Sequence, residues 1–279
     1  MPPWRRERGR GGGEAMRWEG SVALVTGASR GIGRAVARAA AANGARVGLV
    51  ARSEGELDQV LEEIGGRGSV AVADVGQPEE VEAAVGRVEA DLGPVDVVVA
   101  NAGIGLYGPF VEVPVAEMDR LVRVNLLGTM YVLGAVLPGM VARRRGHAVV
   151  VASIAGRLGA PFEAVYSATK FAQVGLTEAL AVELSAFGVG VSMVNPGPVD
   201  TAFFEARGHR YERSFPRPVT AERVAEAVMS AVERRRLEQF VPRWLGQTVV
   251  VRHLLPPLYR SGVRRSFRQE LAGLNASRP

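Results

Sequence analysis

The sequence predicts an α/β fold, namely a doubly wound parallel sheet (Rossmann-like) in a single domain with a short helical extension at its C-terminal end. Short apolar runs alternate with longer helical patterns from Ser21 to Val241. The first run, Val22-Ala23-Leu24-Val25, is entirely apolar, as expected of a strand buried on both faces. A glycine-rich turn follows it directly, and polar residues follow later strands, where ligands bind in such folds.

We expect three regions. Residues 1–17 are rich in Arg and Gly and have little to bury, which favours a disordered tail. Residues 18–242 carry the alternating pattern and form the domain. Residues 243–279 form the helical extension.

Composition limits the function classes. The chain has 279 residues, 47% hydrophobic and without cysteine, which excludes disulfides and thiolate metal sites. His147, His209 and His253 lack the spacing of metal ligands, so no metal is expected. We find no apolar run of the roughly 18–20 residues that span a bilayer and no secretory signal, so a soluble cytoplasmic protein is expected.

Charge is unevenly distributed along the chain. The formal net charge is +5, while residues 207–279 alone carry fifteen Arg against six Glu. This basic quarter could contact anionic lipid or an acidic partner, but solvated arginines are the simpler interpretation. No nucleic-acid partner is predicted, because the arginines are not interleaved with aromatic residues.

The elements follow in alternating order. The first half predicts a helix ending near Asn43, strand Arg46–Val50, helix Ser53–Ile64, strand Val70–Ala73, helix Glu79–Leu92 and strand Val95–Ala100. The second half predicts a long helix from about Val115 to Met140, strand Ala148–Ala152, a helix ending near Phe187, strand Val189–Val194, a helix after Thr220 and strand Gln239–Val241. The repeated strand–helix–strand units predict a doubly wound parallel sheet that binds ligands at the carboxyl ends of its strands.

The turn Thr26-Gly27-Ala28-Ser29-Arg30-Gly31-Ile32-Gly33 lies between a strand and a helix, the context of a dinucleotide site. Its glycines let backbone amides approach a pyrophosphate, and the helix N-terminus stabilises that charge. After the second strand, Ala51-Arg52 stands where many dinucleotide folds place an acid on the ribose 2′-hydroxyl. Arg30 and Arg52 therefore favour NADP(H) over NAD(H), the alternative being that either arginine is merely solvated.

Tyr166 and Lys170 are the candidate acid–base pair. Lys170 is the only lysine among 34 basic residues, which suggests a position that requires a compact ammonium. The i,i+4 spacing places both side chains on one helical face. A neighbouring ammonium would favour the phenolate and lower the pKa of the tyrosine toward the working range. Tyr-x-x-x-Lys alone is a common pattern, so the other stretches decide.

Thr26-Gly27-x-x-x-Gly31-x-Gly33, Asn101-Ala102-Gly103, Asn125, Ser153, Tyr166-x-x-x-Lys170 and Pro196-Gly197 occur in this order. With them the chain resembles the classical short-chain dehydrogenase/reductase family over about residues 18–242. The resemblance implies that Tyr166 is the general acid or base, that Lys170 lowers its pKa and binds the nicotinamide ribose, and that Ser153 holds the substrate oxygen. It implies that Asn125 holds a water linking Lys170 to solvent. The cofactor residues that it implies are Gly27, Ser29, Arg30, Gly31, Ile32, Gly33, Arg52, Asp74, Val75, Asn101, Ala102, Gly103, Tyr166, Lys170, Pro196, Gly197, Val199 and Thr201.

The function expected is an NADP(H)-dependent oxidoreductase acting on a hydrophobic ketone or secondary alcohol. The stretch 199–219, with Phe203, Phe204 and Phe215 among arginines, predicts a lid with an apolar inner side. A 3-oxoacyl thioester reductase is the alternative, and a non-catalytic dinucleotide-binding regulator the second.

Two interfaces are expected. A homodimer or homotetramer would form through the two long helices, whose outer faces are predicted to carry Leu126, Leu133, Phe171 and Leu176. The extension after residue 243 would roof the pocket, pack on a second subunit or lie on a membrane surface, ranked in that order, with packing on its own domain as the simplest alternative.

Overall fold

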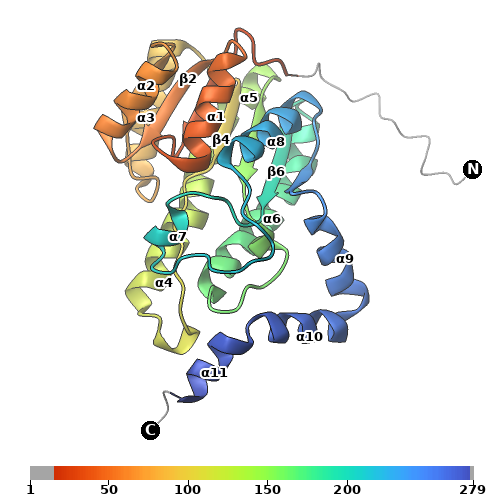
Figure 1. The fold of residues 1–279 in the computed structure, drawn as a ribbon. Helices are drawn as coiled ribbons and strands as arrows, with labels where there is room; N and C mark the ends of the chain where they lie inside the picture. Colours follow the sequence, from red (N-terminus) through yellow and green to blue (C-terminus); the bar gives the residue numbers. More distant parts are fainter. Residues whose placement is uncertain (1–15, 277–279) are drawn as a thin grey trace, which may run out of the picture.

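Seven parallel strands form one sheet in the order β3-β2-β1-β4-β5-β6-β7 (Figure 1). The structure is a computed structural model that describes residues 16–276. The strands are β1 Val22–Thr26, β2 Arg46–Ala51, β3 Gly68–Val72, β4 Val97–Ala100, β5 His147–Val151, β6 Gly190–Pro196 and β7 Glu238–Val241. The predicted fold class is confirmed, since β1 is buried along its whole length and the strand order reverses beside it.

Helices cover both faces of the sheet. One face packs against α1 Gly31–Ala42, α2 Glu54–Glu63 and α8 Ala221–Glu233, and the other against α3 Pro78–Leu92, α5 Gly128–Arg143 and α6 Ala164–Ser185. Each face has its own cluster of buried apolar side chains, made largely of Val, Ala and Leu. This double burial explains why the strands are continuous apolar runs.

The long helix predicted from Val115 is interrupted at its centre. It consists of α4 Val115–Leu121, a π-helical turn Val122–Leu127 and α5. Over Val115–Arg143 it is long and apolar enough, by length and composition, to span a membrane, since an 18-residue window within it has a mean hydropathy of 1.6; this corrects the expectation of no such stretch. In this fold α5 packs on the sheet, with Val132, Val136 and Met140 buried.

The N-terminal boundary of the domain differs from the prediction. Met16 and Trp18 are 6% and 3% exposed and belong to the core, so the domain begins at least by residue 16. Ser21 Oγ donates a 2.7 Å hydrogen bond to the Trp18 carbonyl, which fixes this entry to β1. The rest of the expected tail, residues 1–15, lies outside the described residues.

The C-terminal extension is helical and leaves the sheet. After β7 come α9 Leu245–Leu254, α10 Pro256–Ser266 and α11 Arg268–Ala276. Figure 1 shows them descending from β7 and crossing below the carboxyl ends of the strands, beneath the short helix α7 Phe203–Ala206. They therefore cover the sheet edge at which ligands bind in this class of fold.

Candidate active site

A cavity of about 1910 Å³ opens at the carboxyl ends of the strands. Its walls come from the turn after β1, the ends of β2 to β6, the loop around α7 and the three C-terminal helices. Most of the predicted site residues line it, namely Gly27, Ser29, Arg30, Gly31, Ile32, Arg52, Asp74, Val75, Asn101, Ala102, Gly103, Ser153, Tyr166, Lys170, Pro196, Gly197, Val199 and Thr201. Gly33 and Asn125 lie behind this wall and support it.

The glycine turn fits a dinucleotide pyrophosphate. Gly27 and Gly31 have φ of +64° and +55°, a conformation that favours glycine. A Cβ on Gly33 would lie 2.1 Å from the Gly27 carbonyl oxygen, so only glycine allows the turn to close on α1. No side chain caps the N-terminus of α1, which leaves its first amides free to bind an anion.

Asn101 and Thr26 join the first and fourth strands beneath this turn. Asn101 Nδ2 donates to the Thr26 carbonyl at 2.9 Å, and Thr26 Oγ1 accepts from the amides of Asn101 and Ala102 at 3.0 and 3.1 Å. These bonds hold the floor of the cofactor region in place. Asn101 therefore positions the end of β4 against the end of β1.

Arg30, within the glycine turn, and Arg52, directly after β2, both line this part of the cavity wall. Glu56, in the first turn of α2, also lines the cavity, a carboxylate that the sequence pattern after β2 does not reveal. Asp74 Oδ1 accepts a 2.9 Å hydrogen bond from the Gly76 amide, which orients it after β3. The wall thus offers two guanidinium groups and nearby acids to the adenosine half of a dinucleotide.

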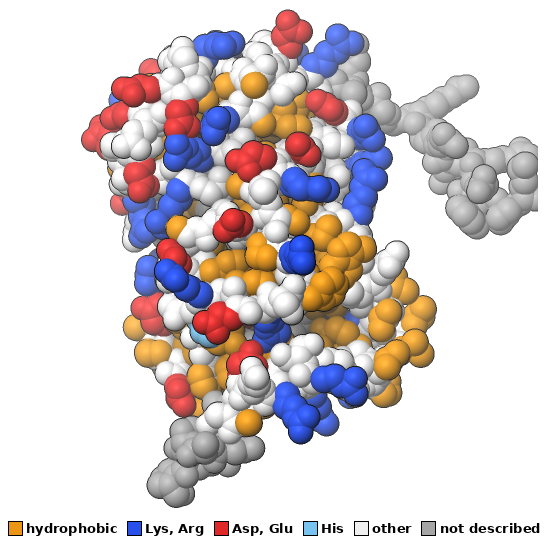
Figure 2. All heavy atoms as spheres, in the orientation of Figure 1, with side chains coloured by type: hydrophobic (Ala, Val, Ile, Leu, Met, Phe, Trp, Pro, Cys, Tyr) orange, Lys and Arg blue, Asp and Glu red, His pale blue; other side chains and the backbone are white. Residues whose placement is uncertain are grey.

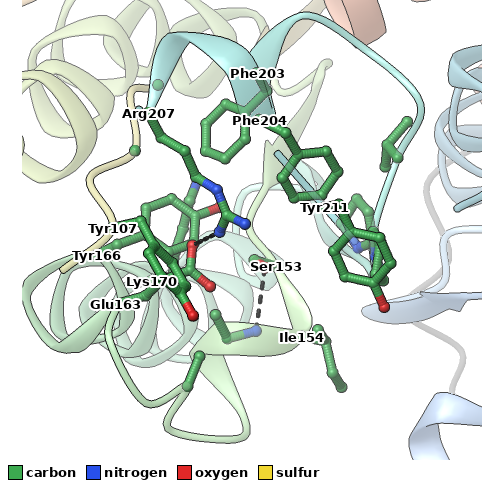
Figure 3. Close-up of a pocket in the computed structure, with 18 of the residues that line it drawn as sticks. Tyr107, Ser153, Ile154, Glu163, Tyr166, Lys170, Phe203, Phe204, Arg207 and Tyr211 are labelled. Atoms are coloured by element: carbon green, nitrogen blue, oxygen red, sulfur yellow. Dashed lines mark hydrogen bonds and ion pairs between the residues drawn. The ribbon is translucent and has the colours of Figure 1, made fainter. Parts of the chain in front are cut away.

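Ser153 and Tyr166 face each other across the floor of the cavity (Figure 3). Ser153 follows β5, and its Oγ accepts a 3.1 Å hydrogen bond from the Ala155 amide, which orients the side chain. Tyr166 lies in the first turn of α6 and is 9% exposed. The Phe203 ring, 5.7 Å away between centroids, excludes water from one side of the phenol.

The pKa of Tyr166 is raised, not lowered. Burial is the main cause, and the charge of Glu163 adds to it, while a hydrogen bond with Ser153 and the charge of Arg207 act in the opposite direction. This corrects the expectation that the ammonium of Lys170 dominates, because burial makes ionising the phenol unfavourable. In the protein alone Tyr166 is therefore a neutral proton donor.

Lys170 is buried one helical turn beyond Tyr166. Its side chain is 3% exposed, and Nζ donates to the Val151 carbonyl at 3.0 Å and to Gln173 Oε1 at 2.9 Å. Burial lowers the pKa of Lys170 to about 7. Nζ lies 5.7 Å from the centroid of the Tyr166 ring, so a proton on Lys170 acts on the phenol through space.

Gln173 connects Lys170 to the π-helical turn. Gln173 Nε2 donates to the Asn125 carbonyl at 2.6 Å and to Thr129 Oγ1 at 2.7 Å, and Thr129 Oγ1 donates to the same carbonyl at 2.8 Å. Both acceptor positions of that carbonyl are thereby filled. The resemblance implies a water between Asn125 and Lys170. In the structure the Gln173 amide connects the Asn125 carbonyl to Lys170, and sequence reasoning missed this residue although it lies i+3 from Lys170.

The Asn125 side chain holds the backbone of Ile104, in the loop that follows β4. Its Oδ1 accepts from the Ile104 amide at 2.8 Å, and its Nδ2 donates to the Ile104 carbonyl at 2.9 Å and to Thr169 Oγ1 at 3.2 Å. The π-helical turn widens the helix at this point, as such turns do at many functional sites. Asn125 is therefore a positioning residue for the Asn101-Ala102-Gly103 loop and for α6.

A buried ion pair forms the opposite wall. Arg207 Nη1 donates to Glu163 Oε1, and the guanidinium carbon lies 4.9 Å from the Tyr107 ring and 4.6 Å from the Phe204 ring (Figure 3). Arg207 is 6% exposed, whereas the sequence suggested a solvent-facing arginine on a lid. No spacing rule links Glu163 to Arg207, because Glu163 directly precedes α6 and Arg207 directly follows α7.

The loop and the C-terminal helices close the cavity together. Arg213 forms a 2.7 Å ion pair with Glu270 and stacks 3.5 Å above the Phe267 ring, while Phe215 stacks on Trp244 at 5.1 Å. The apolar lid is found for Phe203 and Phe204, which line the cavity, whereas Phe215 is 69% exposed at its rim. The extension thus roofs the pocket, as first ranked from the sequence.

His147 is a packing residue. His147 is fully buried, its Nε2 lies 2.8 Å from Ser192 Oγ, and burial together with Arg235 lowers its pKa to about 3. Among residues 16–276, no three His, Cys, Asp or Glu side chains gather in a group that could hold a metal ion.

Known proteins are similar to this chain in sequence and in fold. The model of the short chain dehydrogenase family matches residues 21–212. Oxidoreductase UcpA of Escherichia coli K12 is 37% identical over 222 residues, covering 78% of this chain and 82% of that protein. The 3-oxoacyl-[acyl-carrier-protein] reductase FabG of the same organism is 34% identical over 186 residues, covering 67% and 76%.

Two solved structures are similar across most of the chain. An alcohol dehydrogenase from the archaeon Thermococcus sibiricus, in complex with 5-hydroxy-NADP, has a TM-score of 0.71 and 32% identity and covers 79% of this chain and 95% of its own. A short chain dehydrogenase/reductase from Burkholderia phymatum, in complex with NAD, has a TM-score of 0.80 and 28% identity, with 87% and 96% covered. With its glycine turn, its serine and its Tyr166–Lys170 pair assembled on one cavity, the chain belongs to the short-chain dehydrogenase/reductase family of oxidoreductases.

Proposed function

We propose that this oxidoreductase uses NADP(H) to interconvert a hydrophobic ketone and the corresponding secondary alcohol. The observation that carries the proposal is one continuous cavity. At one end lie the glycine turn, Arg30 and Arg52, and at the other lie aromatic side chains around Ser153 and Tyr166. A carbonyl carbon near these hydroxyls would have an apolar surrounding, which suits a bulky apolar substrate.

The residues of the floor would bind and protonate the substrate oxygen. A bound nicotinamide would supply the hydride in reduction and accept it in oxidation. Ser153, fixed by the Ala155 amide, is oriented to donate a hydrogen bond to the substrate oxygen. Tyr166 is neutral and buried, so it can give its proton to the oxygen as negative charge develops there.

Lys170 would influence the equilibrium between the neutral phenol and the phenolate of Tyr166. With its pKa near 7, Lys170 can hold or release a proton at neutral pH. In the charged form it favours the phenolate that remains after Tyr166 has given up its proton. The amide of Gln173 is a fixed acceptor and does not relay protons, so Lys170 must exchange its proton on the side facing the cavity.

The preference for NADP(H) rests on Arg30 and Arg52. A charge-assisted hydrogen bond from each to a 2′-phosphate contributes about 1.5–3 kcal/mol. Glu56 on the same wall favours a ribose hydroxyl, and the two guanidinium groups would outweigh it in the presence of a phosphate dianion. The dissociation constants of NADPH and NADH test this balance.

Arg52→Ala should weaken NADPH binding about tenfold or more and leave NADH binding nearly unchanged. Arg67→Ala, an exposed arginine at the other end of the strands, is the control. Equal affinity of the parent protein for the two cofactors would contradict the proposed preference.

A 3-oxoacyl thioester reductase is the second candidate, since one relative bears that name. NADPH oxidation against ketones, steroids and acyl thioesters distinguishes the two. A non-catalytic regulator is the third candidate. It is disfavoured because Ser153, Tyr166 and Lys170 all line one cavity, and a protein that only binds a dinucleotide would not need them together.

We also propose a homodimer or homotetramer through the long helices. Leu133 is buried in its own core, which corrects its predicted outward position. Met130 and Val182 instead are 39% and 74% exposed on α5 and α6, and Val115 is 70% exposed on α4. Light scattering at micromolar protein should give at least twice the chain mass, and a monomer would contradict the proposal.

A further inference from the structure

The corner between α9 and α10 carries apolar side chains that nothing in the described chain covers. Val250, Leu254, Leu255 and Leu258, which we call the leucine corner, are 55%, 74%, 52% and 62% exposed. Figure 2 shows the hydrophobic atoms gathered at this edge of the molecule. A contiguous group of protruding leucines is unusual on the surface of a soluble monomer and indicates an interaction site.

Arginines lie directly beside this corner. Residues 243–267 contain five arginines and no acidic residue. Tyr259 and Val263 of α10 turn toward the cavity and are half-buried, so Arg260, Arg264 and Arg265 lie on the opposite, exposed face, which we call the basic face. Among residues 16–273, these three arginines enter no salt bridge.

The cavity opens onto the same surface. Phe215, Trp244, Val251 and Leu258 line the cavity, and all four are also exposed. The rim of the cavity and the leucine corner therefore form one apolar surface. The inner side of α9 and α10 roofs the pocket, while the outer side presents leucines flanked by arginines.

We propose that the leucine corner and the basic face together dock this protein on the surface of an anionic lipid bilayer. Protruding leucines can enter the acyl boundary while neighbouring guanidinium groups stay at the level of the lipid phosphates. A twofold contact between two copies through this surface would bring like charges together. An acidic protein could pair with the arginines, but it would also need a groove to bury the leucines. An anionic bilayer offers both a charged surface for the arginines and an apolar interior for the leucines.

Vesicle flotation with the full-length chain tests this proposal without any substrate or cofactor. The protein should float with vesicles of phosphatidylcholine and phosphatidylglycerol, and much less with phosphatidylcholine alone, and salt should weaken the binding. The double variant Arg264→Ala/Arg265→Ala should lower the partition coefficient about thirtyfold. Leu254→Gln/Leu255→Gln should lower it as well, and should lower the residual binding at high salt.

The matched control is Arg46→Ala/Arg67→Ala, which removes the same charge at the amino ends of β2 and β3, opposite the cavity. Circular dichroism and thermal unfolding verify that each variant is folded. The absence of binding to anionic vesicles, or an equal loss in the control, would overturn the proposal. So would a change of molecular mass in the leucine variant without vesicle binding, because it would identify a second copy as the partner. Neither result depends on the proposed reaction.

Discussion

Replacing Gln173 should shift the pH dependence of catalysis, because Gln173 holds the proton-bearing atom of Lys170. Lys170 Nζ has two acceptors, Gln173 Oε1 at 2.9 Å and the Val151 carbonyl at 3.0 Å. Gln173→Met keeps the length of the side chain and removes the acceptor. A hydrogen bond to a charged group is worth about 1.5–3 kcal/mol, and each pKa unit corresponds to about 1.4 kcal/mol.

The loss of this bond disfavours the ammonium and lowers the pKa of Lys170 further below its present value of about 7. The basic limb of the pH profile of kcat for carbonyl reduction should therefore move to lower pH by about one to two units. At neutral pH the rate should fall about tenfold or more and should recover in mildly acidic buffer. Gln173→Glu, which places a carboxylate beside Nζ, should move the limb in the opposite direction.

Stopped-flow measurement of NADPH oxidation across pH, at saturating cofactor, gives this profile. Gln239→Met is the matched control, since it also removes an amide hydrogen bond, that of Gln239 Nε2 to the Ala227 carbonyl, but far from Lys170. A merely structural role for Gln173 would reduce stability and leave the profile in place. An unchanged basic limb in a folded Gln173→Met protein would refute the reasoning.

Two further predictions concern the cofactor turn and the core. Gly33→Ala should abolish dinucleotide binding, measured by fluorescence titration, because the new Cβ would lie 2.1 Å from the Gly27 carbonyl oxygen. The control is Gly86→Ala, where a Cβ would have no atom within 4 Å. This variant should bind the dinucleotide normally and unfold at the same or a higher temperature. For His147 the folded pKa, about 3, lies below the ordinary value of 6.5, so the unfolded chain binds the additional proton. The stability that neutral His147 contributes should be fully present above pH 6.5 and should decline as pH falls toward 3. In urea titrations at several pH values, His147→Leu should remove this part of the decline. Parallel plots of unfolding free energy against pH for the two proteins would show that another group is responsible.

The sequence by itself determined the fold class and which residues form the floor of the cavity. Buried parallel strands must be continuous apolar runs, and a pyrophosphate turn must have glycine where backbone and ligand meet, so both leave local patterns. Ser153, Tyr166 and Lys170 are placed by the ends of β5 and the first turns of α6, whose positions follow from the same patterns. These features are local in the chain: spacing marked the glycine turn and the Tyr166–Lys170 pair, and the resemblance to a known family added Ser153.

Tertiary structure alone decided the environment of those groups. The pKa of Tyr166 depends on burial under Phe203 and on Glu163, and the proton environment of Lys170 on Gln173, Thr129 and the Asn125 carbonyl. The Glu163–Arg207 pair and the roof made by α9 to α11 join segments far apart in sequence. Desolvation and pairing depend on which atoms surround a group in space, and no residue spacing along the chain encodes that.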